Sequence, residues 1–108
     1  MKLQPSPFAA IKAGTKSIES RLYDDKRQSL QLGDEITFRN MANLDETVTV
    51  KVIELLRYPT FSALFAAFPP SDFGGDSIAT LEEQIYSVYS KADETKFGVL
   101  GIRIEQID

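Results

Sequence analysis

With 108 residues, of which 43% are hydrophobic and 26% charged, the chain is expected to form a single soluble domain over residues 1–108. It contains no cysteine and no histidine, which excludes disulfides, thiolate metal sites, cysteine nucleophiles and histidine-based catalytic triads. The net charge of -4 conceals a basic first part, because residues 1–40 hold seven Lys or Arg against five Asp or Glu. Such a segment either suits an anion or a nucleic acid or is ordinary surface charge.

The first part of the chain is expected to hold a short helix and two strands. Ser6 is the expected N-cap, Pro7 the first helical residue and Gly14 the residue after the helix end. Alternating polarity then predicts strands at residues 17–23 and 35–39, with a polar connection between them.

The middle of the chain predicts a loop, a long strand and a helix. Residues 40–46 are expected to form the loop, and the strand that follows covers residues 47–52 and extends toward Arg57. Four large apolar residues then recur at helical spacing and predict a short helix that two prolines end: Phe61, Leu64, Phe65 and Phe68.

The last part predicts a flexible loop at residues 71–76, then a helix and a closing strand. Thr80 and Glu83 form a capping-box pattern, so the helix is expected to begin after Thr80. The strand covers residues 97–106, with every second side chain directed inward. Strands of uneven spacing with short helices indicate an α+β fold built on a small curved sheet or barrel.

The densest polar cluster of the sequence is Lys16, Glu19 and Arg21. In a strand over residues 17–23, Glu19 and Arg21 project from the same face, and Lys16 lies at the turn into that strand. The three side chains form either a solvated row of ion pairs or the floor of a pocket, in which the two cations bind phosphate, carboxylate or base acceptor groups.

The run Gly14-x-Lys16-x-x-Glu19-x-Arg21, which follows a short helix, resembles the motif of the ASCH domain family in the PUA-like superfold. The pattern Leu30-x-Leu32-Gly33-Asp34-x-Ile36-x-Phe38 and the closing segment from Phe97 to Ile104 agree with it, so the resemblance covers nearly the whole chain. It implies a small PUA-like β-barrel of about five or six strands, with two or three flanking short helices and a cleft that carries the motif.

The resemblance implies a module that binds RNA or a nucleotide, with Lys16, Glu19 and Arg21 in the cleft. Tyr23 shares the parity of Glu19 and Arg21 and is the expected stacking residue. The other candidate ligand-binding residues lie on the neighbouring strand and in the flexible loop: Arg39, Asp72 and Asp76. Lys26 and Arg27 are either an extension of a basic rim for phosphates or solubilising surface residues.

Two alternatives remain at the level of sequence. Some relatives of this type are amidohydrolases that deacetylate acetylcytidine, using the motif lysine, a threonine three residues later and a downstream glutamate. Here Lys16 is present, but Glu19 occupies the hydroxyl position and the later loop offers Asp72 and Asp76 instead of a glutamate. An enzyme would therefore use Lys16 and Glu19, either with Lys16 as the base or with Glu19 activating water. The second alternative is a protein-interaction domain that uses its acidic side.

No cofactor and no metal are expected. Asp72, Asp76 and the Glu82-Glu83 pair lack the spacing of a calcium loop. Met1 and Lys2 are followed by prolines instead of an apolar targeting segment, and the longest apolar stretch is about half of what a bilayer requires. We therefore expect a cytoplasmic protein without a membrane partner.

Overall fold

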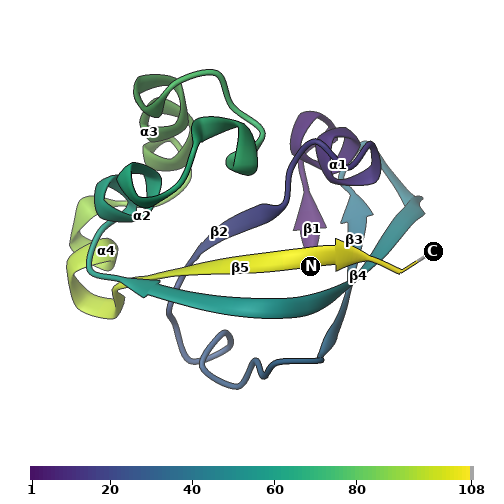
Figure 1. The fold of residues 1–108 in the computed structure, drawn as a ribbon, viewed down its shortest axis with the longest axis horizontal. Coiled ribbons are helices and arrows are strands. Elements are labelled where there is room, and N and C mark those ends of the chain that lie inside the picture. The colour runs from purple at the N-terminus through teal and green to yellow at the C-terminus, as the bar shows by residue number, and fades with distance from the viewer. Residues whose placement is uncertain (108) are drawn as a thin grey trace.

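The computed structural model, which describes residues 1–107, is a five-stranded sheet that curls into a half-barrel with helices on both sides (Figure 1). The strands are β1 (Lys2–Leu3), β2 (Ile18–Leu22), β3 (Glu35–Asn40), β4 (Asn43–Tyr58) and β5 (Val99–Gln106). They lie in the order β1-β3-β4-β5-β2, and only the β1–β3 pair is parallel. The expected α+β class and curled sheet are confirmed, and β1 and β2 form the two edges of the half-barrel.

Four α-helices flank the sheet, where two or three were expected. They are α1 (Pro5–Lys12), α2 (Phe61–Ala67), α3 (Ile78–Tyr86) and α4 (Lys91–Phe97), with a 3₁₀ helix, η1 (Pro70–Phe73), between α2 and α3. Helix α1 stands on one side, and the other helices gather at the opposite end of the sheet (Figure 1). No helix within residues 1–107 is long and apolar enough to cross a membrane.

The boundaries of two helices differ from prediction. Helix α1 begins at Pro5 with Gln4 as N-cap instead of Ser6, because the first-turn N–H groups need no helical acceptor and both prolines fit there. Helix α3 has Ser77 as its N-cap, and the Ser77 side chain accepts a hydrogen bond from the backbone N–H of Thr80. Thr80 is thus a residue of the first turn, and the capping-box prediction placed the start three positions late.

The remaining differences concern the expected loop at residues 40–46 and the closing strand. Strand β4 already begins at Asn43, because the β3–β4 ribbon extends past the core with exposed polar side chains. Helix α4 lacks apolar periodicity and was not predicted. It begins at Lys91, after the N-cap Ser90, whose side chain accepts a hydrogen bond from the backbone N–H of Asp93. The helix includes Phe97, so β5 begins at Val99.

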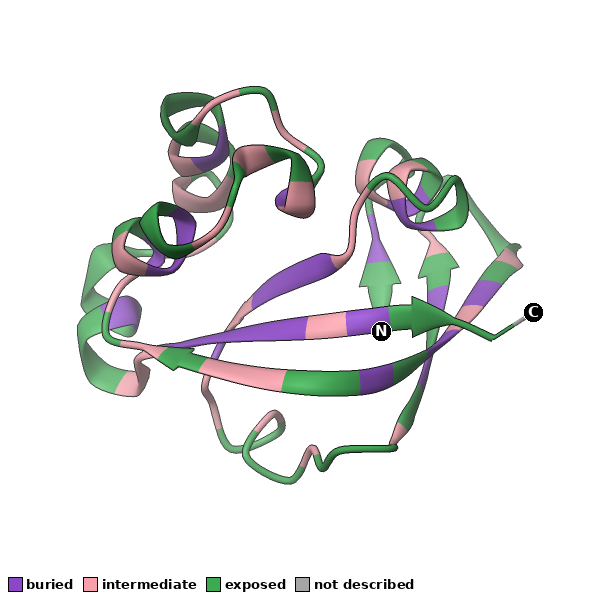
Figure 2. Cartoon of the chain, viewed as in Figure 1, coloured by how far each residue is buried: buried purple, intermediate pink, exposed green. Residues whose placement is uncertain are grey.

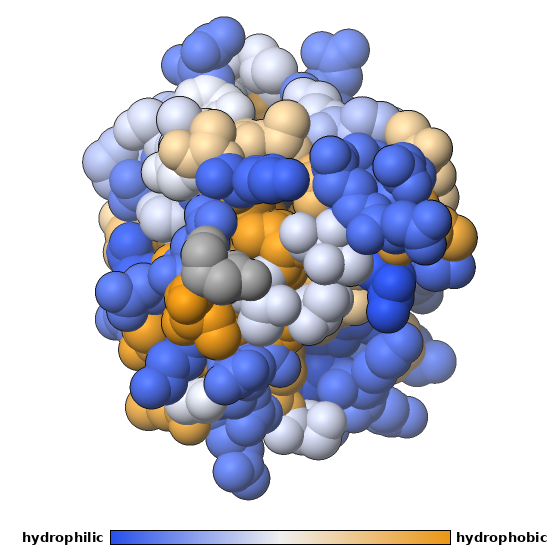
Figure 3. Space-filling model, turned by 90° about the vertical axis from the view of Figure 1, so that its right-hand side faces the viewer, coloured by the Kyte–Doolittle hydropathy of each residue, from blue (hydrophilic) through white to orange (hydrophobic). Residues whose placement is uncertain are grey.

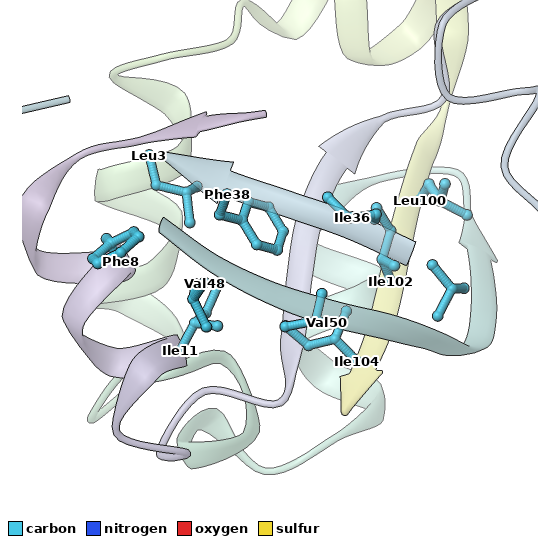
Figure 4. Close-up of a cluster of buried hydrophobic side chains, with 11 residues drawn as sticks. Leu3, Phe8, Ile11, Ile36, Phe38, Val48, Val50, Leu100, Ile102 and Ile104 are labelled. Atoms are coloured by element: carbon cyan, nitrogen blue, oxygen red, sulfur yellow. The ribbon is translucent and has the colours of Figure 1, made fainter. Parts of the chain in front are cut away.

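The core consists of two hydrophobic clusters that share the sheet. One fills the half-barrel beneath α1 and β1, and Figure 4 shows Phe8 and Ile11 of α1 approaching Val48, with Phe38 beside Leu3. The other lies under α2 and α3 and includes Phe61, Leu64 and Phe65. Strand β2 contributes Ile18 and Leu22 to the second cluster and is buried along most of its length, so that Figure 2 draws most of it in purple. Polar side chains on β2 are therefore forced into the interior.

One face of the molecule is mainly polar. Figure 3 shows the face that appears at the right of Figure 1, where hydrophilic side chains surround smaller hydrophobic areas. The exposed large hydrophobic residues include Leu32, Met41 and Ile107, which come from different parts of the chain. No broad apolar surface dominates this face.

Gly101 allows α2 to approach β5 closely. A Cβ atom at this position would lie 2.9 Å from Leu64 Cδ1 and 3.3 Å from Leu56 Cβ. We expect Gly101→Ala to lower the free energy of unfolding by about 1–3 kcal/mol, as overpacking of a close-packed core does. Urea denaturation followed by circular dichroism measures this, with the exposed Lys51→Ala variant as control. Equal stability of the two variants would contradict the tight contact.

Candidate functional site

A pocket of about 410 Å³ lies between α1, the free edge of β2 and α3. Lys16, Glu19 and Arg21 are the only charged side chains in its lining within residues 1–107, which gives the pocket a net charge of +1 in a chain of net charge -4. The opposite wall is largely apolar: Phe65, Phe73, Leu81, Ile85 and Val88. This volume lies in the usual range for small-molecule sites in proteins, roughly 300–1,000 Å³.

The turn after α1 delivers Lys16 to the start of β2. Gly14 has a φ of +79°, the left-handed conformation that glycine adopts without strain, and thereby ends the helix. The backbone N–H groups of Thr15 and Lys16 then both donate to Ala10 O, at 2.9 and 3.2 Å. From Ser17 onward the chain is anchored by its N–H bond to Asp72 O, 2.8 Å long, so the motif enters the sheet in a fixed register.

Glu19 lies between the two cations, as its spacing predicts. Its Oε1 is 3.1 Å from Lys16 Nζ, and its Oε2 is 3.2 Å from Arg21 Nη2. The backbone N–H of Ser20 donates a further hydrogen bond of 3.0 Å to Oε1. The Glu19 residue is only 4% exposed, so the group is a buried ionic trio and not a solvated row of ion pairs.

The trio determines the protonation of its members. Burial alone would raise the pKa of Glu19, but the charges and hydrogen bonds of Lys16 and Arg21 outweigh it and hold the pKa below its usual value. For Arg21, burial opposes the charged form, while Glu19 and the Tyr89 hydroxyl favour it more strongly and raise the pKa. Glu19 is therefore a carboxylate and Arg21 a guanidinium at neutral pH.

Two further contacts fix the cations. Arg21 Nη2 donates to Lys2 O at 3.3 Å, so this side chain links β2 to β1 across the opening of the half-barrel. Lys16 packs along Gly74, where a Cβ would lie 3.1 Å from Lys16 Cβ. The left-handed Gly74, with a φ of +79°, thus lets the loop after η1 cover the lysine stem.

The other predicted ligand-binding residues lie outside the lining of this pocket. The ring of Tyr23 is covered by Arg57, whose Cζ is 3.7 Å from the ring centroid. Arg39 donates to Leu44 O at 3.1 Å on the β3–β4 ribbon. The carboxylate of Asp72 lies 3.9 Å from Arg103, and Asp76 is exposed. Of the predicted set, the structure brings together only the ionic trio.

Several lining residues escaped the sequence reasoning. Ser20 also lines the pocket although it alternates with Glu19 and Arg21 along β2, because the pocket wraps around the free edge of this strand. Gln84, Val88 and Tyr89 form the far rim. Val88 and Tyr89 follow the end of α3, and Val88 is 70% exposed, which is typical of a surface open to a ligand more than of a core position.

Within residues 1–107 no group of three or more acidic side chains is arranged to hold a metal ion. The chemistry that this pocket offers therefore comes from its two cations, the carboxylate between them and the surrounding hydroxyl, amide and apolar groups. Cations of this kind bind phosphate oxygens and the carbonyl acceptors of bases, and Arg does so with a planar fork of donors.

The comparisons with known proteins concern the family and the fold. The model of the ASCH domain family matches residues 1–108. Among solved structures, the crystal structure of hypothetical protein PH0355 superposes with a TM-score of 0.87 at 34% identity, covering 99% of this chain and 96% of that one. The solution NMR structure of Protein PF0455 from Pyrococcus furiosus gives a TM-score of 0.76 at 28% identity, with coverages of 100% and 96%. No curated protein matches the chain.

Proposed function

Since the chain belongs to the ASCH domain family, we propose that its pocket binds RNA by taking up one nucleotide unit, with Lys16 and Arg21 as the recognising cations. The observation that carries this proposal is the buried trio, which presents a net positive charge opposite an apolar wall. A nucleotide has the matching chemistry, because it combines anionic and carbonyl acceptors with a flat apolar base face.

The donor inventory supports the assignment. Lysine has three N–H donors and arginine five, and the contacts of the trio engage only part of them. Glu19 holds both cations in place and lets them lie side by side in the interior. On the opposite wall, Phe73, Leu81 and Ile85 offer the apolar contact that a base requires.

The state of Glu19 favours binding over hydrolysis. A general base works best when its pKa lies near the operating pH, whereas the pKa of Glu19 is lowered and both of its oxygens are engaged. Water activation by Glu19, which is one route for the hydrolase alternative, is therefore unfavourable. We propose a binding module that does not turn over its ligand.

Blocking the pocket is expected to abolish this binding. Val88 lines the pocket and is 70% exposed, so Val88→Trp fills the mouth without disturbing the core. Arg21→Ala removes the guanidinium from the floor. Each variant should bind a fluorescein-labelled oligoribonucleotide at least roughly tenfold more weakly in fluorescence anisotropy, since a good Arg contact to a base contributes about 1–3 kcal/mol.

Matched controls separate this effect from the added bulk of tryptophan and from the loss of one positive charge. Ile78→Trp adds the same side chain at an exposed position outside the lining, and Arg57→Ala removes an exposed arginine outside it. Both should bind like the parent protein. Parent-like affinity of Val88→Trp and Arg21→Ala would show that the pocket is not the binding site.

A further inference from the structure

We propose that the RNA strand leaves the pocket at Arg21 and runs across β1, where a basic track of Lys2, Lys26, Arg27 and Arg39 binds its phosphates. This inference rests on the proposed function and deepens it, because it names an oligonucleotide strand, rather than a free mononucleotide, as the ligand. A single nucleotide would occupy the pocket alone and leave the track empty.

Strand β1 connects the pocket to the first part of the track. Lys2 is exposed, and its parallel pairing with Arg39 on β3 places the two side chains on the same outward face. From the other side, Arg21 Nη2 reaches the carbonyl oxygen of Lys2 at 3.3 Å. Arg21 therefore belongs both to the pocket lining and to the immediate surroundings of β1.

The connection between β2 and β3 brings the other two cations to the same place. Leu30 of this connection and Met1 pack against the same hydrophobic cluster. Burial lowers the pKa of the Met1 α-amine, and the charges of Arg21, Lys26, Arg27 and Arg39 lower it further. These cations come from three separate segments of the chain, and each lies close enough to the start of β1 for its charge to act on the Met1 α-amine.

Most of the track is not neutralised. Arg27 pairs with Asp24 at 3.2 Å, but Lys2, Lys26 and Arg39 have no carboxylate within ion-pair distance among residues 1–107. The Nε of Arg27 is buried and has no hydrogen-bond partner among residues 1–107. An unpaired cluster of this kind attracts a polyanion locally even though the whole chain carries a net charge of -4.

The track predicts a characteristic salt dependence. Each phosphate neutralised on a single strand contributes about -0.7 to the slope of log affinity against log salt concentration. Three unpaired cations therefore predict a slope of about -2 for an oligonucleotide, beyond whatever the pocket itself contributes. Nucleoside monophosphates, which reach only the pocket, should show a smaller slope.

The test compares two triple variants that remove the same charges. Lys2→Ala/Lys26→Ala/Arg39→Ala removes the three unpaired cations of the track and leaves Arg27, and Lys51→Ala/Arg57→Ala/Lys96→Ala removes two lysines and one arginine elsewhere. Affinity for a random-sequence hexaribonucleotide and for the four nucleoside monophosphates is measured between 25 and 300 mM salt, about a tenfold range that resolves the slope. We expect the track variant to bind the hexamer at least roughly tenfold more weakly than the matched variant at low salt, with most of its slope lost.

The outcomes distinguish this inference from the proposed function. If both triple variants bind the hexamer with equal affinity and slope, or if the parent binds no hexamer, the track is overturned. The monophosphates and the Val88→Trp variant test the pocket separately. Suppose that Val88→Trp abolishes the binding of monophosphates, while the two triple variants bind the hexamer with equal affinity. This result would support the pocket and contradict the track. If the track variant weakens hexamer binding but Val88→Trp does not, the result would support the track and contradict the pocket.

Discussion

Replacing Glu19 by alanine is expected to lower the free energy of unfolding by about 3–5 kcal/mol, the range for breaking a buried ion pair. The change leaves Lys16 and Arg21 close together without their counter-charge, and their side chains are only 13% and 14% exposed. The backbone N–H of Ser20 also loses its acceptor. Urea denaturation at pH 7, followed by far-ultraviolet circular dichroism, measures the loss.

A second variant separates the uncompensated charge from the cavity that alanine creates. Lys16→Met/Glu19→Leu/Arg21→Met replaces the whole trio by apolar residues of similar volume, which is often neutral or stabilising for a buried ionic group. We expect it to recover most of the stability that Glu19→Ala loses. If Glu19→Ala instead lowers the free energy of unfolding by less than about 1 kcal/mol, the trio stabilises the fold no more than exposed ion pairs do.

The apolar variant also bears on function. If a chain without the trio folds as stably as the parent, the charges are not needed for the fold, and their retention in a pocket is explained by a ligand. We expect this variant to bind neither oligonucleotide nor nucleoside monophosphates. The variant would then keep the stability of the parent and lose its binding. A purely structural role for the trio does not allow this result.

The sequence predicted the elements whose pattern is strong. Period-two alternation located β2 and placed Glu19 and Arg21 on one face, and helical spacing located α2 between Phe61 and Ala67. It did not reveal α4, because most residues of this helix are charged and have no apolar periodicity. Contacts with other segments of the chain hold this helix in place. Glu94 of α4 is 5% exposed and accepts hydrogen bonds from the Phe61 backbone N–H and the Tyr86 hydroxyl. Such contacts join segments that no local pattern connects.

The same limit applies to the site. The motif identified the pocket floor because its three charges lie within six residues of one strand and turn. The opposite wall comes from α2, η1 and α3, and its identity depends on how η1 packs against β2 and how α3 packs against α2 and η1. Tyr23 shares the strand parity of Glu19 and Arg21, but β2 ends at Leu22 and Arg57 covers the ring. Parity therefore predicted which side chains share a face of β2, and tertiary packing decided which of them reach the pocket.

Acidification is expected to remove the contribution of Glu19 only at low pH. Burial tends to raise the pKa of this carboxyl, but Lys16 and Arg21 outweigh it, so the folded-state pKa lies below the unfolded one. A group whose pKa is depressed by folding stabilises the protein fully above its unfolded pKa, about 4.3 for Glu. That stabilisation is lost as the pH falls through the folded-state pKa.

The measurement is the difference in the free energy of unfolding between the parent and Glu19→Gln, followed from pH 8 to pH 2. This substitution keeps the shape of the side chain and removes only its titration, so the other carboxyl groups cancel in the difference. We expect a constant difference down to about pH 4.3 and a steady decrease below it. A decrease that already begins between pH 8 and pH 5 would mean that burial prevails and the folded-state pKa is raised. Glu19 would then take up a proton near neutral pH, which would return it to the candidates for a general base and reopen the hydrolase alternative.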